Sequence, residues 1–494
     1  MTRVQTTTTS PLLRERVVRG LAWKATSSIF LQVARIVVGV VLAHLLSPHD
    51  YGLAGMVLVF SSLVLVFSDL ALGSALVFRE TLTEDDRSTV FWTSVGAGFL
   101  LTAVGIALSG PLAVFYGEPA VKSLFAAMSL SFLISAVAST QAALLAREMN
   151  FKSLEVRKIG AAIASATVGI TLAARGYGAW AIIGQQITVA LVSTIFLWFS
   201  SAWRPHLKYS RASLRHLGGY SSNVFGARLL FYVNRNADNL LVGRFLGPAA
   251  LGAYAVSYNV MLAPISQISI PVQDVLFPAF SRMQNDVPAM TAIWLRVNRV
   301  IASITMPALL GLIAVAPDFV HVALGDRWSA ATRVIQILAW VGLLQSLQGL
   351  NGSVLRAVDR TSTLLRYSVV VLVASLAAFT VGLQWGIVGV ATAYAVSSTF
   401  VEPYYTWLTT RSVGLPLWAF VKSLAGVSQA SLAMFLSVIA VRLALTRSGL
   451  SPGLRLPILI FLGAAVYLPL CAWRAPQVVD ELRTLRRRRS IGAT

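Results

Sequence analysis

The chain has 494 residues, of which 56% are apolar and only 12% are charged, and its mean hydropathy is +0.73. No ordinary soluble domain has this composition, so the sequence predicts an all-α integral membrane protein. The formal net charge of +21 does not call for a nucleic-acid partner, because the basic residues are spread over many short segments between apolar stretches.

Apolar segments of membrane-spanning length follow one another along almost the whole chain. About 20 apolar residues cross a bilayer, and division at charged and Pro/Gly-rich breaks predicts about fourteen transmembrane helices. These lie at 21–46, 51–78, 88–116, 119–146, 153–175, 177–200, 216–246, 249–281, 291–316, 328–356, 363–383, 387–410, 417–444 and 453–474.

A stretch near the N-terminus recurs two hundred residues later. Aligned without a gap, Arg35 matches Arg235, Pro48 matches Pro248 and Gly52 matches Gly252. Each copy consists of an apolar helix, a tight Pro turn and a second apolar helix. Repeats of this kind enclose the central pathway of many transporters, so we expect two pseudo-symmetric six-helix bundles. The expected domains are a cytoplasmic N-terminal segment 1–20, bundles at 21–205 and 206–411, two additional helices at 412–474 and a basic cytoplasmic tail at 475–494.

The distribution of basic residues predicts the orientation of the chain. Arg147, Lys152, Arg157 and Lys158 fill one predicted inner loop, whereas the outer turns at 47–50, 247–250 and 384–386 contain no Lys or Arg. By the positive-inside rule, both termini are cytoplasmic. Most tryptophans, Trp294 and Trp328 among them, lie near predicted helix ends, where interfacial aromatic residues are expected.

No catalytic, cofactor or metal site is predicted. The densest acidic cluster is Glu84, Asp85 and Asp86, and the spacing of Thr83 and Asp86 just before a helix favours a capping role over a metal site. The histidines are scattered, without metal-ligand spacing. A single cysteine, Cys471, cannot form an internal disulfide.

Ionisable residues inside the predicted helices are the main functional candidates, because each is costly at the bilayer centre and should face the bundle interior or a wet cavity. They are Arg35, Asp69, Arg228, Arg235, Asp238, Arg244, Asp274 and Glu402. Arg244 and Asp274 lie close enough to helix ends to reach the interface. Asp69, Asp238 and Glu402 are candidates for ion coupling, but the sequence does not choose between that role and a structural one.

The seventh predicted helix carries a polar stripe. Arg228, Tyr232, Arg235 and Asn239 recur at intervals of three and four residues, so they share one helix face that would line a water-filled cavity. The alternative is structural, since Asp238 lies three residues from Arg235 and the two charges would neutralise each other.

The eighth predicted helix contains prolines spaced by seven, at Pro264, Pro271 and Pro278. Each proline removes a backbone hydrogen bond and bends the helix, and the spacing puts the bends on nearly one face. The sequence predicts either a hinge for opening a lateral gap or a static curve that fits the packing.

Three motifs carry a resemblance to a known family. The runs LLSPHDYG at 45–52, ADNLLVGRFLGPAALGAY at 237–254 and VLFPAFSRM at 275–283 are similar to those of bacterial polysaccharide flippases of the multidrug/oligosaccharidyl-lipid/polysaccharide exporter superfamily, with the teichuronic-acid and colanic-acid exporters nearest. The resemblance covers about residues 20–473. It implies two six-helix bundles in a V shape around a cavity, with two C-terminal helices added. It also implies that a polyprenyl-diphosphate-linked oligosaccharide is turned from the inner to the outer leaflet.

The anionic diphosphate of that substrate suits the arginines of the polar stripe. Guanidinium groups donate two parallel hydrogen bonds to phosphate, so Arg35 and Arg235 are expected to bind the diphosphate, with Arg228 receiving it first. The expected partners are membrane lipids, the glycan substrate, and glycosyltransferases and a polymerase of the same pathway, in a bacterial cytoplasmic membrane. Three alternatives remain: a lipid II flippase, a multidrug antiporter of the same superfamily, and a membrane polysaccharide polymerase or ligase.

Overall fold

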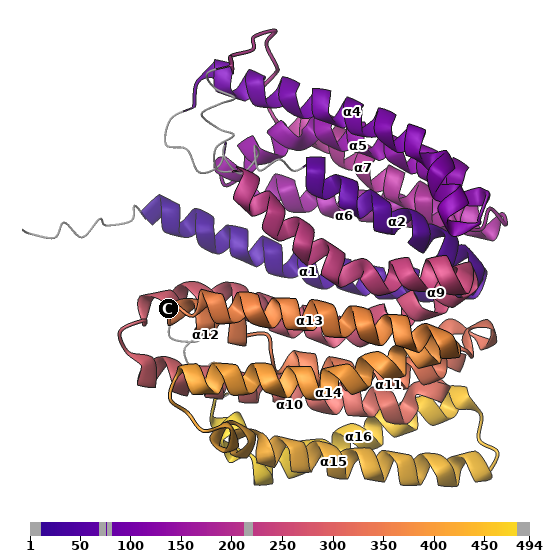
Figure 1. Cartoon of the computed structure of the whole chain (residues 1–494), viewed down its shortest axis with the longest axis vertical. Helices are drawn as coiled ribbons and strands as arrows, with labels where there is room; N and C mark the ends of the chain where they lie inside the picture. Colours follow the sequence, from indigo (N-terminus) through magenta and orange to yellow (C-terminus); the bar gives the residue numbers. More distant parts are fainter. Residues whose placement is uncertain (1–10, 69–75, 77–81, 212–220, 482–494) are drawn as a thin grey trace, which may run out of the picture. The chain divides into compact units, whose positions relative to one another are not determined.

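The computed structural model describes residues 11–68, 76, 82–211 and 221–481. Within these ranges the chain is helical and contains no β-strand, which confirms the predicted all-α class. The chain divides into two compact units, residues 1–252 and 253–494. The first unit contains α1 (Pro11–Leu45), α2 (Pro48–Ser68), α4 (Glu84–Tyr116), α5 (Ala120–Arg147), α6 (Phe151–Ala174), α7 (Trp180–Ser200) and the first half of α9 (Ser221–Arg282) (Figure 1).

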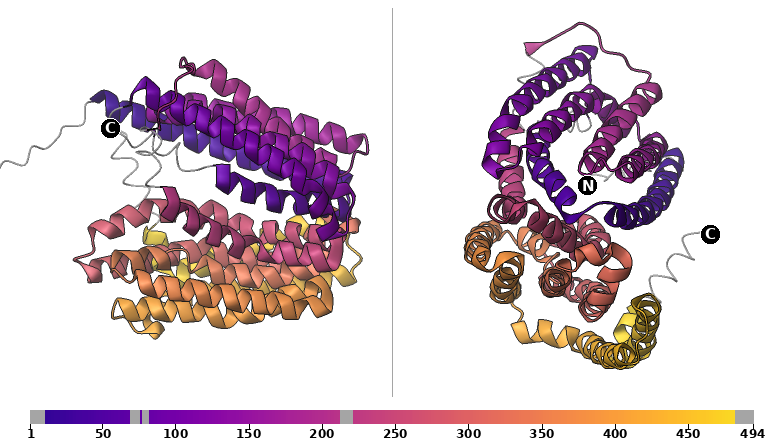
Figure 2. Two further views of the ribbon diagram at one scale, coloured as in Figure 1. Left: turned by 45° about the horizontal axis from the view of Figure 1, so that its top comes forward. Right: turned by 90° about the vertical axis from the view of Figure 1, so that its right-hand side faces the viewer.

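The second unit begins within α9 and includes both C-terminal helices. Its elements are α10 (Val287–Phe319), η1 (Val320–Leu324), η2 (Asp326–Trp328), α11 (Ala331–Ser346), α12 (Asn351–Ala357), α13 (Thr361–Gly382), η3 (Leu383–Trp385), α14 (Gly386–Ser412), α15 (Leu417–Arg447) and α16 (Pro452–Arg474). The long helices within each unit run side by side, as the views in Figure 2 show. The predicted domain boundary at 205/206 stays a prediction.

Ten helical segments among the described residues are long and apolar enough to cross a membrane. Two of them, Arg235–Arg282 with 48 residues and Thr361–Ser412 with 52, have the length of two crossings each and coincide with pairs of predicted helices. The protein is therefore a multi-pass membrane protein. The count of fourteen helices stays a prediction, because some of the predicted spans run through residues outside the described ranges.

The acidic cluster forms the first turn of α4, and Asp86 takes part in capping that helix, as the sequence predicted. The Thr83 side chain accepts a hydrogen bond from the Asp86 backbone N–H at 3.1 Å, and the Asp86 carboxylate accepts one from the Thr83 N–H at the same distance. This reciprocal arrangement satisfies two backbone donors that the first helical turn leaves without partners. At the other end, Gly117 adopts φ 70°, the left-handed conformation that ends a helix most easily without a Cβ atom.

Small residues allow the helices of the first unit to pack closely. Gly98 and Gly105 of α4 face Ala136 and Ser129 of α5 with no room for a larger side chain. The Thr102 hydroxyl donates to the backbone oxygen of Ser129 at 3.0 Å. In a membrane, close backbone approach and interhelical hydrogen bonds hold helices together, because lipid offers no hydrophobic driving force between them.

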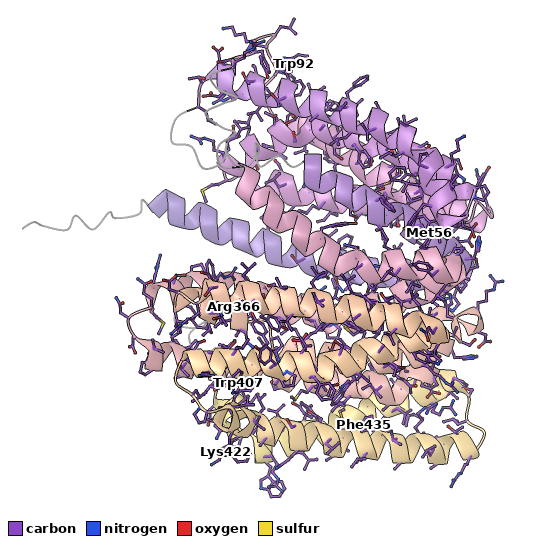
Figure 3. All side chains as sticks on the ribbon, viewed as in Figure 1. Met56, Trp92, Arg366, Trp407, Lys422 and Phe435 are labelled. Carbon is purple, nitrogen blue, oxygen red and sulfur yellow. The ribbon has the colours of Figure 1, made fainter. Side chains whose placement is uncertain are left out.

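Large aromatic residues fill the second unit. Trp294 and Trp328 are fully buried, and Trp294 stacks on Phe420 at 5.1 Å between ring centroids. Both residues lie near helix ends, as predicted, but they are buried within the protein, and their position at the membrane interface stays a prediction. Other tryptophans, such as Trp407, are exposed at helix ends as predicted (Figure 3).

Candidate functional site

The two Pro turns of the sequence repeat meet in the first unit. Helix α1 ends just before Pro48, and α9 breaks at Gly247, where φ is 82° and ψ is 178°, just before Pro248. Gly52 lies against the Pro248 carbonyl, and Gly252 lies against the Pro48 carbonyl, with no room for a Cβ atom at either glycine. The reciprocal contact relates the two copies as the alignment predicted, so the repeat is a three-dimensional feature of the molecule.

The turns set the depth of the two matched arginines. Arg35 and Arg235 each precede their turn by the same number of residues, which corresponds to about 17 Å along a helix axis. Both side chains are exposed in the structure. The Arg35 Nη1 atom donates to the Gln32 side-chain oxygen at 3.4 Å, and among the described residues no carboxylate forms an ion pair with Arg235. The alternative that the sequence left open, a pairing of Arg235 with Asp238, is not seen among the described residues.

The polar stripe predicted from the sequence lies on α9, where one of its residues bonds another helix and another has an acceptor oxygen without a hydrogen-bond partner among the described residues. The Tyr232 hydroxyl donates to the backbone oxygen of Val59 in α2, so this side chain holds the two helices together. The Asp238 carboxylate is buried and accepts a hydrogen bond from the Asn239 N–H at 2.7 Å. The Asn239 side-chain oxygen is also buried and has no hydrogen-bond partner within the described part of the chain. A ligand with a free donor would satisfy it.

Some predicted site residues cannot be placed. Asp69 lies outside the described residues, and only the backbone of Arg228 is described, within α9. The three prolines of the eighth predicted helix, Pro264, Pro271 and Pro278, lie in the second half of α9, whose backbone is helical from Pro248 to Arg282. Whether they form a hinge stays a prediction.

A buried carboxyl group lies in the second unit. Glu402 of α14 is 8% exposed and accepts a hydrogen bond from the Tyr367 hydroxyl of α13 at 3.2 Å. The Tyr367 ring stacks on that of Tyr405, with centroids 3.7 Å apart and planes 7° from parallel. No Lys or Arg among the described residues forms an ion pair with Glu402. Whether Glu402 has the predicted coupling role or a structural one stays a prediction.

Another buried carboxylate, that of Asp318, was missed in the sequence. Asp318, at the end of α10, is fully buried and binds two arginines: its Oδ2 atom lies 2.5 Å from Arg442 Nε of α15, and its Oδ1 atom lies 2.5 Å from Arg455 of α16. The three residues clasp both C-terminal helices to α10. Asp318 lies two residues beyond the predicted end of its helix, and the signal that could have found it is the pair of arginines flanking the 448–451 turn.

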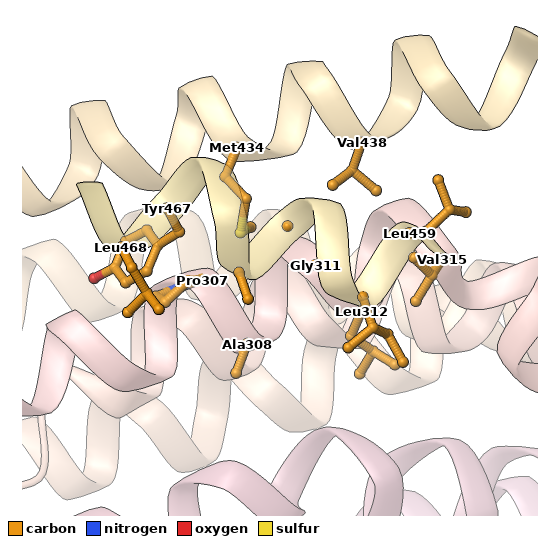
Figure 4. A pocket seen from close by; sticks show the side chains of 13 residues that line it. Pro307, Ala308, Gly311, Leu312, Val315, Met434, Val438, Leu459, Tyr467 and Leu468 are labelled. Carbon is orange, nitrogen blue, oxygen red and sulfur yellow. The ribbon is translucent and has the colours of Figure 1, made fainter. Parts of the chain in front are cut away.

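An apolar cavity of about 380 Å³ lies between α10, α15 and α16 (Figure 4). Residues lining it include Pro307, Leu312, Met434 and Leu459. Its one polar side chain is that of Tyr467, whose hydroxyl already donates to the Ser303 backbone oxygen at 2.6 Å. Such a lining accommodates an alkyl chain and offers little to a polar group. Elsewhere, the described residues contain no group of three His, Cys, Asp or Glu side chains that could hold a metal ion.

The fold defines the class of the protein. The structure is similar to that of the lipid II flippase MurJ in an inward closed conformation, with a TM-score of 0.74 and 17% identity over 92% of this chain and 99% of that chain. It also resembles an inward-facing multidrug resistance MATE family transporter of the MOP superfamily, with a TM-score of 0.63 and 12% identity over 79% and 96% of the two chains. The protein therefore has the fold of multi-pass membrane transporters.

The sequence defines the family within that class. A profile described as "Polysaccharide biosynthesis protein" matches residues 41–333, which is more than half of the chain. The chain belongs to the polysaccharide biosynthesis protein family. It is 28% identical to the lipopolysaccharide biosynthesis protein WzxC of Escherichia coli (strain K12), over 72% of this chain and 73% of WzxC. It is 26% identical to the teichuronic acid biosynthesis protein TuaB of Bacillus subtilis (strain 168), over 96% and 98%.

Proposed function

We propose that the protein is a flippase that moves polyprenyl-diphosphate-linked oligosaccharide from the inner to the outer leaflet of a bacterial cytoplasmic membrane, by alternating access, for assembly of cell-surface polysaccharide. The family match over residues 41–333 carries the proposal. It is supported by the similarity to WzxC and TuaB along most of their lengths and by the transporter fold.

The intramembrane charges fit an anionic headgroup. Arg35 and Arg235 occupy equivalent positions in the repeat, and their exposed guanidinium groups can donate paired hydrogen bonds to phosphate oxygens. Two cations of like sign persist inside a membrane when water and a polyanion offset their repulsion. On this proposal the protein binds and reorients its substrate without changing a covalent bond, so it has no enzymatic activity.

Deletion of the gene tests the proposed function directly. We expect the lipid-linked oligosaccharide to accumulate on the inner leaflet and surface polysaccharide to be lost, with both defects reversed by a plasmid copy of the gene. Normal export in the deletion strain, in the absence of a second transporter of this family, would refute the proposal.

The proposed orientation places both termini, and the segment from Arg147 to Lys158, in the cytoplasm. His49 and Ala249 are exposed beside the two Pro turns, so cysteines introduced there should react with an impermeant thiol reagent in intact cells lacking Cys471. A cysteine in place of Lys152, which is exposed near the start of α6, should react only after the membrane is opened. The reverse pattern of labelling would invert the topology.

The second candidate is a lipid II flippase, favoured by the fold likeness to MurJ along nearly the whole chain. It differs in cargo and not in direction, so identifying the accumulated lipid distinguishes the two. A multidrug antiporter exporting organic cations would be expected to present acids to its cavity, whereas the residues matched in the repeat are arginines.

A further inference from the structure

A cavity lined by apolar residues, several hydroxyl groups, one amide and one guanidinium lies inside the first unit. It has a volume of about 270 Å³, is open on one side, and is lined by α5, α7 and Arg157 of α6. The α7 residues that line it, from Gln186 to Leu197, follow one helix face, so the cavity is about 16 Å long. The small side chains of Ala138, Ala142 and Ala190 leave room for the cavity. Hydroxyl groups and a guanidinium also line it.

Arg157 supplies the charge in this cavity. Its Nε atom is buried and has no hydrogen-bond partner, and no ion pair of its guanidinium occurs within the described ranges. The nearby carboxylate of Glu155 is already engaged, since it binds Lys158 at 2.7 Å and accepts a hydrogen bond from Ser27. Glu155 does not line the cavity, although its charge acts on Arg157. The partly buried guanidinium thus offers an unused Nε–H donor to an open cavity.

The neutral polar groups of the cavity divide into two sets. The hydroxyls of Ser131, Ser139 and Thr194 donate to backbone oxygens, at 2.6 to 2.9 Å. The side chains of Ser135, Ser193 and Gln186 make no hydrogen bond to another residue in the described part of the chain. Together with Arg157 they offer several free donors around one space and no carboxylate, which suits an oxyanion.

The position of Arg157 follows from the packing of α6 on α7. Gly160 of α6 lies 3.0 Å, measured from an added Cβ atom, from the Phe196 ring, so Arg157 lies about one turn nearer the Ser200 end of α7. In the proposed orientation this is the cytoplasmic end. An arginine that served only to set the membrane topology would extend its guanidinium to the membrane interface, and it would not need a cavity with polar side chains beside it.

We propose that this cavity is an oxyanion-binding subsite, in which Arg157 binds a phosphate-type group with help from Ser135, Ser193 and Gln186. The subsite rests on the proposed function only for the identity of its natural ligand. That ligand is either the diphosphate of the transported lipid or the phosphate of a bilayer lipid. Both present the same chemistry to the guanidinium.

Cysteine reactivity in the purified, lipid-reconstituted full chain tests the subsite without transport, so a failure here is distinguishable from a failure of the proposed function. A Ser135→Cys variant lacking Cys471 is treated with an anionic and a cationic methanethiosulfonate of similar size. We expect the anionic reagent to react faster by on the order of fivefold relative to a Ser123→Cys control, which lies on the exposed outer end of the same helix. Adding Arg157→Gln should abolish the preference, and Arg157→Lys should retain part of it.

Two protection experiments identify the source of the oxyanion. If inorganic pyrophosphate slows labelling of Ser135→Cys in vesicles of zwitterionic lipid, the cavity takes a water-borne phosphate group, as a substrate headgroup would present. If slowing requires phosphatidylglycerol in the vesicles, the cavity takes a bilayer lipid headgroup. Equal rates for both reagents, unaltered by Arg157→Gln in a variant that unfolds at the wild-type temperature, would overturn the proposal.

Discussion

Gly252 packs directly on the backbone of Pro48, so closely that a Cβ atom at Gly252 would overlap the Pro48 carbonyl oxygen. The same contact occurs in reverse between Gly52 and Pro248. These four residues are the matched positions of the sequence repeat. Two helix pairs cross here with backbone against backbone, and only glycine allows that approach.

Replacing Gly252 with alanine should therefore loosen the first unit. The methyl group must displace backbone and not a flexible side chain, so we expect a destabilisation of about 1 to 3 kcal/mol and a lower unfolding temperature in detergent. Gly39→Ala in α1 is the matched control, because nothing lies within 4 Å of its added Cβ atom. An unfolding temperature for Gly252→Ala equal to that of the Gly39→Ala control would show that the backbone contact is not needed.

The repeat was visible in the sequence because its signals are local: a proline, a glycine four residues later and an arginine at fixed distance. The burial of Trp294, the Asp318 clasp and the Arg157 cavity were not visible. Periodicity and charge place a residue along a helix, but the direction of its side chain depends on which neighbour lies there. Arg157 was counted with the basic residues of an inner loop, although it lay within the predicted helix 153–175, and α6 begins at Phe151, capped by Asn150.

Asp318 should be essential for holding the C-terminal helices. In Asp318→Asn two arginines lose their shared carboxylate in a buried site, and leaving such charges unpaired costs about 3 to 5 kcal/mol. We expect a marked fall in unfolding temperature and faster proteolysis at the 448–451 turn. Asp286→Asn, which alters only the exposed helix cap that bonds the Ala289 N–H at 3.1 Å, should cost about 1 kcal/mol. Equal behaviour of the two variants would mean that the clasp contributes little.

A Glu402→Gln variant separates a role of this residue in ion coupling from a role in folding. In Glu402→Gln the side chain keeps its shape and still accepts a hydrogen bond from Tyr367, so abundance in the membrane should stay near normal. If Glu402 carries a proton during transport, the variant should lose the stimulation of export by an imposed proton gradient in vesicles. Tyr367→Phe, which removes the hydroxyl donor and leaves the carboxyl group, should keep that stimulation in part. Full stimulation in Glu402→Gln would assign Glu402 a structural role.

The matched arginines are the sharpest test of substrate binding. Each would donate charge-assisted hydrogen bonds of about 1.5 to 3 kcal/mol to a phosphate, so Arg35→Ala or Arg235→Ala should slow export roughly 10- to 100-fold and accumulate the lipid-linked precursor inside. Lysine at either position keeps the charge but loses the two-pronged geometry, so it should restore only part of the rate. Arg244→Ala is the control, on the same helix as Arg235, because Arg244 is exposed near the Gly247 break and contacts the rings of Phe115 and Phe245. The measurement is export rate per inserted protein. If both alanine variants insert normally and export at the rate of the Arg244→Ala control, these arginines do not bind the diphosphate, and the repeat serves only to build the turns.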